Sequence, residues 1–115
     1  MKIGLNVVEA IKVSKIVNNW VAETVGEMRL VSSIGDITDM TQDDKGRSGL
    51  REMHAENGLA YYTWDQDITM ERELDKRQAD MLAHMIETPR NVGWRRDEMS
   101  MAYGLLKQLG HEVTP

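Results

Sequence analysis

Three arginines surround a tryptophan in residues 89–96, which read Pro-Arg-Asn-Val-Gly-Trp-Arg-Arg. The residues of interest are Arg90, Trp94, Arg95 and Arg96. Arginine binds phosphate and carboxylate groups in a bidentate manner, and tryptophan can stack on a base or anchor a protein interface. Asp97 and Glu98 follow directly and reduce the local positive charge. The preferred interpretation is structural, with Trp94 in the core and the arginines paired with nearby acids. Of the two binding interpretations, a protein contact is favoured over a nucleic-acid contact.

A second aromatic cluster lies in residues 59–64, which read Leu-Ala-Tyr-Tyr-Thr-Trp. Adjacent aromatic and β-branched residues favour a strand, although an extended loop whose aromatic side chains fill the core is an alternative. Aromatic residues are also enriched among those that contribute most to protein interfaces. Tyr61, Tyr62 and Trp64 are therefore predicted, together with the four residues above, to bind a partner.

Asp80, His84 and Glu87 follow one another at i, i+4 and i+7, so on a helix they share one face. Carboxylate and imidazole groups are metal ligands. The same face also carries basic residues, as the solvent-exposed side of an amphipathic helix does. A metal site would need a further ligand from another element, and nothing in the sequence brings His54 or His111 near. These three residues are weak metal candidates only, and no cofactor is expected.

Residues 35–49 are rich in Asp, Gly and Ser and are expected to form a loop. A calcium-binding loop beginning at Asp39 would require glycine at its sixth position and glutamate at its twelfth. These positions hold Asp44 and Leu50. The calcium pattern therefore fails, and a solvated turn is the preferred interpretation.

Composition narrows the class of protein. The chain has no Cys, which excludes disulfides, thiolate metal sites and cysteine nucleophiles. The formal net charge is −5, which disfavours binding to nucleic-acid phosphates. The sequence has neither a Gly-x-x-x-x-Gly-Lys phosphate loop nor a Gly-x-Ser-x-Gly turn, so an enzyme is the less favoured class. Polar residues break every apolar run, so no membrane segment is expected, and a cytoplasmic location fits best.

The most secure predicted element is a helix that begins after Asn6, a good N-cap with an acid three residues later. Apolar residues at helical spacing cover a broad arc, and Lys12 falls on the narrow polar stripe opposite. The arc continues through residues 28–34, so the helix is predicted to run to Gly35. An end at Gly26 and a short strand over residues 28–34 are the alternatives.

Shorter elements are predicted in the middle of the chain. Ser48 can cap a short helix over residues 50–56, ended by Asn57-Gly58. Residues 59–64 have strand character, and a strand needs a partner, which only residues 28–34 could supply.

Two more helices are predicted in the second half of the chain. The first spans residues 69–87, with Asp67 or Thr69 as its cap. The second begins at Trp94 or Asp97 and ends at Leu109, with Gly110 as a C-terminal stop and residues 111–115 as a loose tail.

These elements predict one mainly α-helical domain over residues 1–115. The expected architecture is a small bundle of three main helices and one short helix, with room for a minor two-stranded β element. The chain of 115 residues, 41% hydrophobic, can bury a core.

The leading functional hypothesis is a non-enzymatic, acidic protein-interaction module, a regulator or inhibitor that binds a larger protein partner. A nucleic-acid-binding accessory protein that uses residues 90–96 is the first alternative, and a metal-dependent hydrolase is the second. Homodimerisation is expected if the wide apolar arc of the first helix is not fully covered. A small acidic protein of this kind could also come from a phage or other mobile element.

Overall fold

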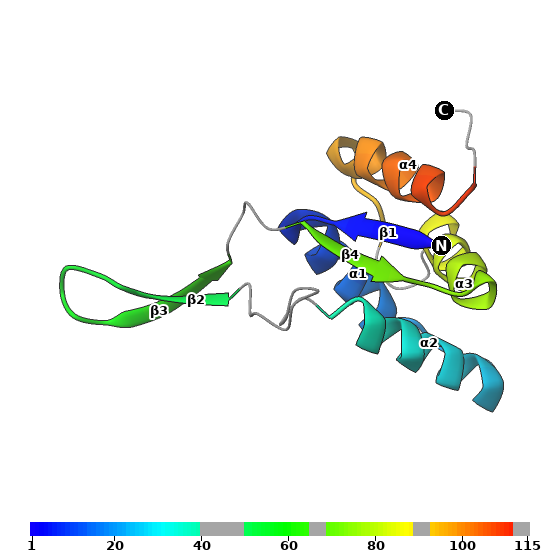
Figure 1. Cartoon of the computed structure of the whole chain (residues 1–115), viewed down its shortest axis with the longest axis horizontal. Helices are drawn as coiled ribbons and strands as arrows, with labels where there is room; N and C mark the ends of the chain where they lie inside the picture. The colour runs from blue at the N-terminus through cyan, green and yellow to red at the C-terminus, as the bar shows by residue number, and fades with distance from the viewer. Residues whose placement is uncertain (40–49, 65–68, 89–92, 112–115) are drawn as a thin grey trace.

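The computed structural model describes residues 1–39, 50–64, 69–88 and 93–111. This part of the chain is mainly helical, as the sequence predicts, with four α-helices, a 3₁₀ turn and two separate two-stranded antiparallel sheets (Figure 1). Strands β1 and β4 lie with the helices, and we call these six elements together the helical body. Strands β2 and β3 form a hairpin that extends away from the helical body (Figure 1).

The first strand of the helical body pairs with a segment far along the chain. β1 (Lys2–Leu5) lies antiparallel to β4 (Met70–Glu73), with Lys2 opposite Glu73 and Leu5 opposite Met70. Ile3 and Leu5 are completely buried. β1 was not predicted, and the prediction that residues 69–87 form one helix is wrong at its start. Both strands are too short for a clear alternating pattern, so only tertiary pairing reveals them.

The first predicted helix begins where expected but is broken in two. α1 (Val7–Asn18) has the predicted cap, because Asn6 Oδ1 accepts the Glu9 N–H at 2.9 Å and Glu9 Oε1 accepts the Asn6 N–H at 3.0 Å. Asn19 ends the helix, and its side chain donates to the Lys15 carbonyl oxygen at 2.8 Å. Such side-chain bonds to the backbone compete with the helical ladder.

A second helix, α2 (Val25–Ile37), begins at a cap that sequence analysis missed. Thr24 Oγ1 accepts the Glu27 N–H at 3.0 Å, which satisfies one of the open donors at the helix start. Residues 28–34 are therefore helical, as preferred, and the alternative of a strand there is wrong. A Cβ atom on Gly35 would lie 3.3 Å from Val17 Cγ1, so glycine allows α2 to approach α1 closely.

The predicted short helix over residues 50–56 is wrong, because these residues belong to a hairpin. β2 (Leu50–His54) pairs with β3 (Ala60–Trp64), so the predicted strand over residues 59–64 is confirmed but its partner is not residues 28–34. Gly58 N–H donates to the Ala55 carbonyl oxygen at 2.9 Å, and Gly58 has φ +81°. This is a turn followed by a left-handed glycine, a common hairpin geometry.

The two remaining helices follow the predicted order with different starts. α3 (Lys76–Glu87) is capped by Asp75, whose side chain accepts the Gln78 N–H at 2.8 Å, and not by Asp67 or Thr69. A 3₁₀ turn, η1 (Arg96–Glu98), leads into α4 (Met99–Gln108).

The predicted stop at Gly110 is confirmed. Gly110 has φ +80°, its N–H donates to the Lys107 carbonyl oxygen at 3.1 Å, and the His111 N–H donates to the Leu106 carbonyl oxygen at 2.8 Å. These two bonds satisfy carbonyl groups that the helix end would otherwise leave open. The rest of the predicted loose tail, residues 112–115, and most of the predicted acidic loop, residues 40–49, lie outside the described residues.

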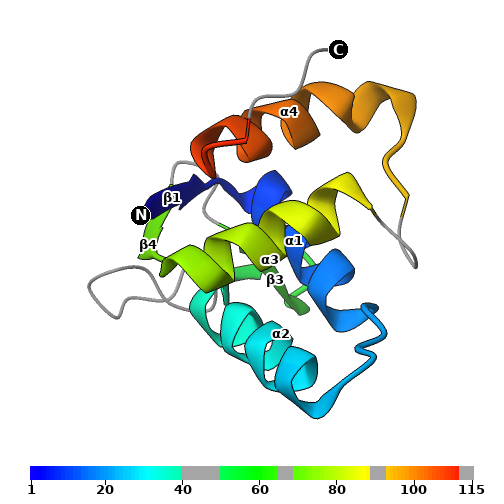
Figure 2. The same ribbon diagram turned by 90° about the vertical axis from the view of Figure 1, so that its right-hand side faces the viewer.

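The core lies between the β1–β4 pair and the helices. α3 contacts each of the other three helices, and it lies between α2 and α4 in Figure 2. Its apolar face is fully buried, with Leu82, Ala83 and Met85 at 0% exposure. Burial of apolar surface of this kind is the main force that holds such a body together.

The edge of β1 is covered by one side chain of α4. Gln108 Oε1 accepts the Gly4 N–H at 2.8 Å, and Gln108 Nε2 donates to the Gly4 carbonyl oxygen at 3.1 Å. The amide thus takes the place that a third strand would occupy. Exposed strand edges pair readily with other chains, so this contact both fastens α4 to β1 and protects the edge.

Replacement of Gln108 by Ala should lower the free energy of unfolding by about 1 kcal/mol, because two hydrogen bonds to Gly4 are lost. Urea denaturation followed by circular dichroism measures the change. Lys107→Ala is the matched control, since Lys107 is exposed on the same helix. Equal stability of the two variants would show that the amide contact contributes nothing.

Candidate functional site

Trp94, the centre of the arginine-rich segment, is held by contacts within the helical body. It is half-buried, packs against the core, and its indole Nε1–H donates to the Ile86 carbonyl oxygen at 2.8 Å near the end of α3. The ammonium of Lys12 lies 5.1 Å from the centroid of the indole ring, within cation–π range. These contacts give Trp94 a structural role in joining α1, α3 and the start of α4.

Lys12 departs from its predicted place on the solvent-exposed stripe of α1. It is only 8% exposed. Its ammonium donates to the Gly93 carbonyl oxygen at 2.8 Å and to Glu98 Oε1 at 3.2 Å. A buried ammonium is stable only when it is paired and hydrogen-bonded. The partners come from the segment after α3, so the placement of Lys12 could not be read from the pattern of α1 alone.

Glu98 connects this buried ammonium to the arginine-rich segment. Its Oε1 also accepts the Arg95 N–H at 2.9 Å. This backbone hydrogen bond is the main reason that the pKa of Glu98 lies below its ordinary value, and Lys12 lowers the pKa further. Glu98 thus does more than reduce the positive charge of the arginine-rich segment, because it also fixes the backbone at Arg95 and pairs with Lys12.

The arginines are partly neutralised by the acids that follow them. Arg95 is exposed, and its Nη2 lies 2.9 Å from Asp97 Oδ2. The hydrogen bond to Asp97 is the main cause of the raised pKa of Arg95. Arg96 is exposed in η1, and Arg90 lies outside the described residues. The described part of the segment therefore has little net positive charge to offer a phosphate.

The candidate metal residues of α3 have other neighbours. Asp80 and Glu87 flank His111, with His111 Nε2 at 3.6 Å from Asp80 Oδ1 and His111 Nδ1 at 3.7 Å from Glu87 Oε1. The ring of His84 instead packs edge-on against Trp20, with the centroids 5.6 Å apart. The structure brings His111 to α3, which sequence analysis did not expect. Within the described ranges, no three His, Asp or Glu residues are grouped so that they could hold a metal ion.

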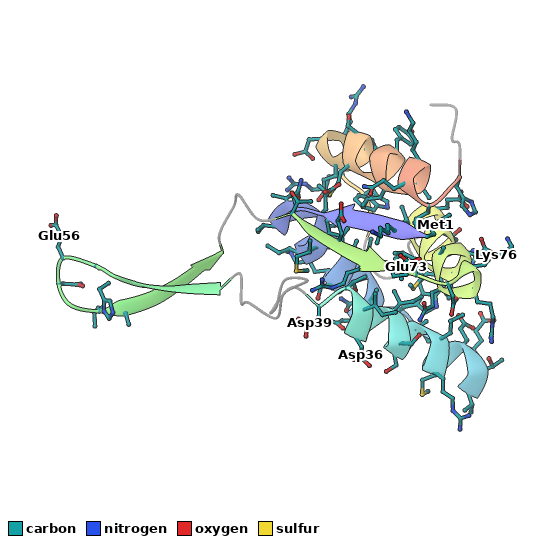
Figure 3. All side chains as sticks on the ribbon, viewed as in Figure 1. Met1, Asp36, Asp39, Glu56, Glu73 and Lys76 are labelled. Carbon is teal, nitrogen blue, oxygen red and sulfur yellow. The ribbon has the colours of Figure 1, made fainter. Side chains whose placement is uncertain are left out.

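The predicted partner-binding residues Tyr61, Tyr62 and Trp64 all lie in β3 of the hairpin. The register places Tyr61 opposite Met53, Tyr62 opposite Glu52 and Trp64 opposite Leu50. We call residues 50–64 the arm. Among the described elements, β2 and β3 have substantial contact only with each other. Figure 3 labels Glu56 at the tip of the arm, far from the helices.

The tip of the arm ends in an exposed apolar side chain. Leu59 is 68% exposed. Its N–H donates to Asn57 Oδ1 at 3.1 Å, so the backbone of the turn is ordered although the side chain has no cover.

A groove between α1 and α2 is the second uncovered feature. Its volume is about 790 Å³. It is lined by Ala10, Ile11, Ser14, Lys15, Val17, Asn18, Met28, Val31, Ser32, Gly35, Asp36, Thr38 and Asp39. Ile11 is 42% exposed and Met28 is 60% exposed. Sequence analysis missed this groove because it exists only if the N-terminal helix breaks after Asn18. The Asn18-Asn19 pair and the Thr24-x-x-Glu27 capping pattern are the signals that could have revealed the break.

Searches of the sequence and the structure found no matching family model, no similar curated protein and no similar solved structure. No helix among the described residues is both long enough and apolar enough to cross a membrane.

Lys12→Met should lower the free energy of unfolding by about 2 kcal/mol, because the buried ammonium is lost and the Gly93 carbonyl oxygen and the partly exposed Glu98 carboxylate each lose a charged donor. Urea denaturation measures the change. Lys15→Met on the same helix is the control, since Lys15 is exposed. A Lys12→Met variant as stable as Lys15→Met would show that the ammonium contributes no net stability.

Glu98→Gln should reduce the loss of stability in acid. Because the pKa of Glu98 is lowered in the folded protein, its contribution is present above its ordinary pKa of 4.5 and is lost as pH falls through the folded value. Unfolding free energies measured in urea at neutral and acidic pH should differ more for the unmodified protein than for Glu98→Gln. Asp97→Asn retains Glu98 and should keep the full acid dependence, so a parallel pH profile for all three proteins would contradict this assignment.

Proposed function

We propose that this protein is a non-enzymatic protein-interaction module, a regulator or inhibitor that binds a larger protein partner through its β2–β3 arm. The observation that supports this proposal is the position of the arm, which extends away from the helical body and, among the elements that the structure describes, has substantial contact only within itself (Figure 1). The helical body does not need the arm for its own packing.

Energetics favour a partner for such an arm. An isolated two-stranded hairpin is at best marginally stable in water, and it gains stability when a third strand or another surface covers one face. The arm carries Tyr61, Tyr62 and Trp64 together with the exposed Leu59. Aromatic residues dominate the energetics of protein interfaces. A protein surface that covers these residues would therefore stabilise the arm and gain affinity from it.

The charges near Trp94 do not favour the nucleic-acid alternative. Lys12 is buried against Glu98, and Arg95 is paired with Asp97. A protein that binds phosphates needs uncompensated basic side chains on its surface. The acidic composition, with a formal net charge of −5, instead suits a regulator that approaches a basic region of another protein. Such a regulator would act in the cytoplasm.

The test compares partner capture by matched variants of the tagged protein in extracts of its native host. Tyr62→Ala should reduce the recovered partner by about 10- to 30-fold, as expected when an interface aromatic is truncated. The variant should keep the thermal unfolding of the helical body, because β2 is the one described element with which β3 has substantial contact. Trp94→Ala should instead destabilise the helical body, since its ring contacts Lys12 and its indole N–H is bonded to Ile86.

Arg96→Ala is the control for the other predicted surface, because Arg96 is exposed in η1. It should leave capture unchanged. Loss of capture in Arg96→Ala with full capture in Tyr62→Ala would place the contact on the arginine-rich segment and overturn the proposal. Salt-sensitive binding to DNA or RNA that Arg96→Ala abolishes would support the nucleic-acid alternative instead.

A further inference from the structure

The hydrogen bonds at the turn of the arm determine which of its backbone groups face outward. The Ala55 N–H donates to the Leu59 carbonyl oxygen at 3.0 Å, so these two residues form a hydrogen-bonded pair. Along an antiparallel ladder, pairs of this kind alternate with pairs whose N–H and C=O groups point away from each other. The next pair in the register, His54 with Ala60, is therefore of the second kind.

Each long edge of the arm thus carries a row of backbone groups that β2 and β3 do not use between themselves. The outward-facing residues are Ala60, Tyr62 and Trp64 in β3 and Leu50, Glu52 and His54 in β2. The sheet of the arm has two strands, so within the described residues no third strand covers either edge. Such a row matches the spacing and the hydrogen-bonding pattern of a further strand. The geometry therefore specifies an extended backbone as the occupant.

The two edges differ in the charges of their strands. β2 contains Arg51 and Glu52, whereas β3 reads Ala-Tyr-Tyr-Thr-Trp and contains no charged residue. Charged residues are a common means by which proteins keep an exposed edge from pairing with another chain. Aromatic and β-branched residues, in contrast, favour strand pairing. β3 is therefore the edge that can accept another strand.

The helical body covers one of its own edges, which β3 does not have in common with it. In β1, both the N–H and the C=O of Gly4 are bonded to the side-chain amide of Gln108. The arm extends away from the four helices (Figure 1), and β2 is the described element with which β3 has substantial contact. Ala60 is exposed and has the shortest side chain of β3, so another backbone can approach it closely.

Charge favours a strand from another protein over a strand from a second copy of this chain. Each copy has a formal net charge of −5, so two copies repel each other. A partner with a basic surface is attracted instead, and opposite charges increase the rate at which two proteins meet. The uncharged edge of β3 then contributes main-chain hydrogen bonds to the complex.

We propose that the larger partner supplies an extended segment that pairs with the β3 edge and extends the sheet of the arm to three strands. Main-chain hydrogen bonds at Ala60, Tyr62 and Trp64 hold the segment, which is the general mode of recognition by strand addition. The third strand also gives the arm the stability that a two-stranded hairpin lacks. This inference deepens the proposed function and rests on the arm being the interaction element.

A pair of proline variants tests which edge the partner uses. Ala60→Pro removes an outward N–H from β3, and His54→Pro removes the outward N–H directly across the ladder in β2. Neither change removes a hydrogen bond between the two strands. Ala60→Pro should reduce the protein recovered from extracts of the native host by at least about tenfold, because a hydrogen bond is lost and the ring obstructs the incoming strand. His54→Pro should leave the recovery unchanged.

Amide hydrogen exchange provides a readout that depends on no variant. In the purified complex of the unmodified chain with the protein that it recovers, the Tyr62 and Trp64 amides should exchange at least about tenfold more slowly than in the free chain. The Glu52 amide on the other edge is the internal control and should not change. The Met53 and Tyr61 amides point toward the opposite strand, so their exchange in each proline variant shows whether the arm keeps its pairing. If a proline opens the arm, the exchange pattern of the unmodified complex decides.

Three outcomes would overturn the inference. They are equal recovery by the two proline variants with the arm still paired, slower exchange in the complex at Glu52 but not at Tyr62 and Trp64, and slower exchange at Tyr62 and Trp64 that appears in the free protein as its concentration rises. The last outcome would assign the edge to a second copy. Full recovery by Ala60→Pro with loss of recovery by Tyr62→Ala would reject the strand pairing and keep the proposed function. Full recovery by both variants would reject both proposals.

Discussion

The pairing of β1 with β4 is the constraint on which the rest of the helical body depends. It joins segments almost seventy residues apart, and three helices take their positions from it. α1 starts directly after β1 at the Asn6 cap, and α3 starts directly after β4 at the Asp75 cap. α4 is tied to the free edge of β1 by Gln108. Because the strand ends and the caps are adjacent, the direction of each helix follows from the direction of the strand before it.

The parts of the fold that local chemistry decides could be predicted from the sequence. The cap at Asn6 and the stop at Gly110 are local signals and are confirmed. The helical nature of residues 28–34 followed from their spacing. The errors over residues 2–5, 50–54 and 70–73 share one cause, which is that these residues become strands only by pairing with a distant or adjacent segment. In short segments such pairing overrides local propensity.

The difference between local signals and contacts with distant segments also explains which features of the candidate site could be predicted. Trp94 and the arginines were conspicuous because of their residue types, but what such residues do depends on their neighbours. Lys12 comes from a different helix. Its ammonium lies over the indole ring of Trp94 and forms an ion pair with the Glu98 carboxylate. No pattern within α1 distinguishes a lysine that reaches solvent from one that meets a distant acid. The strand over residues 60–64 could be predicted, but its position away from the helices could not, because that depends on the pairing of β2 with β3.

The conspicuous residues fall into two groups, those that have partners inside the protein and those that are exposed to solvent. Where the Trp94 segment is described, most of its conspicuous groups have partners within the chain: the indole, the Glu98 carboxylate and the Arg95 guanidinium. The arm and the α1–α2 groove instead expose apolar groups whose burial would release free energy. The packing of the helical body therefore does not depend on whether another surface covers the arm. If the arm is the interaction element that we propose, its affinity for a partner can change without a change in the folding of the helical body.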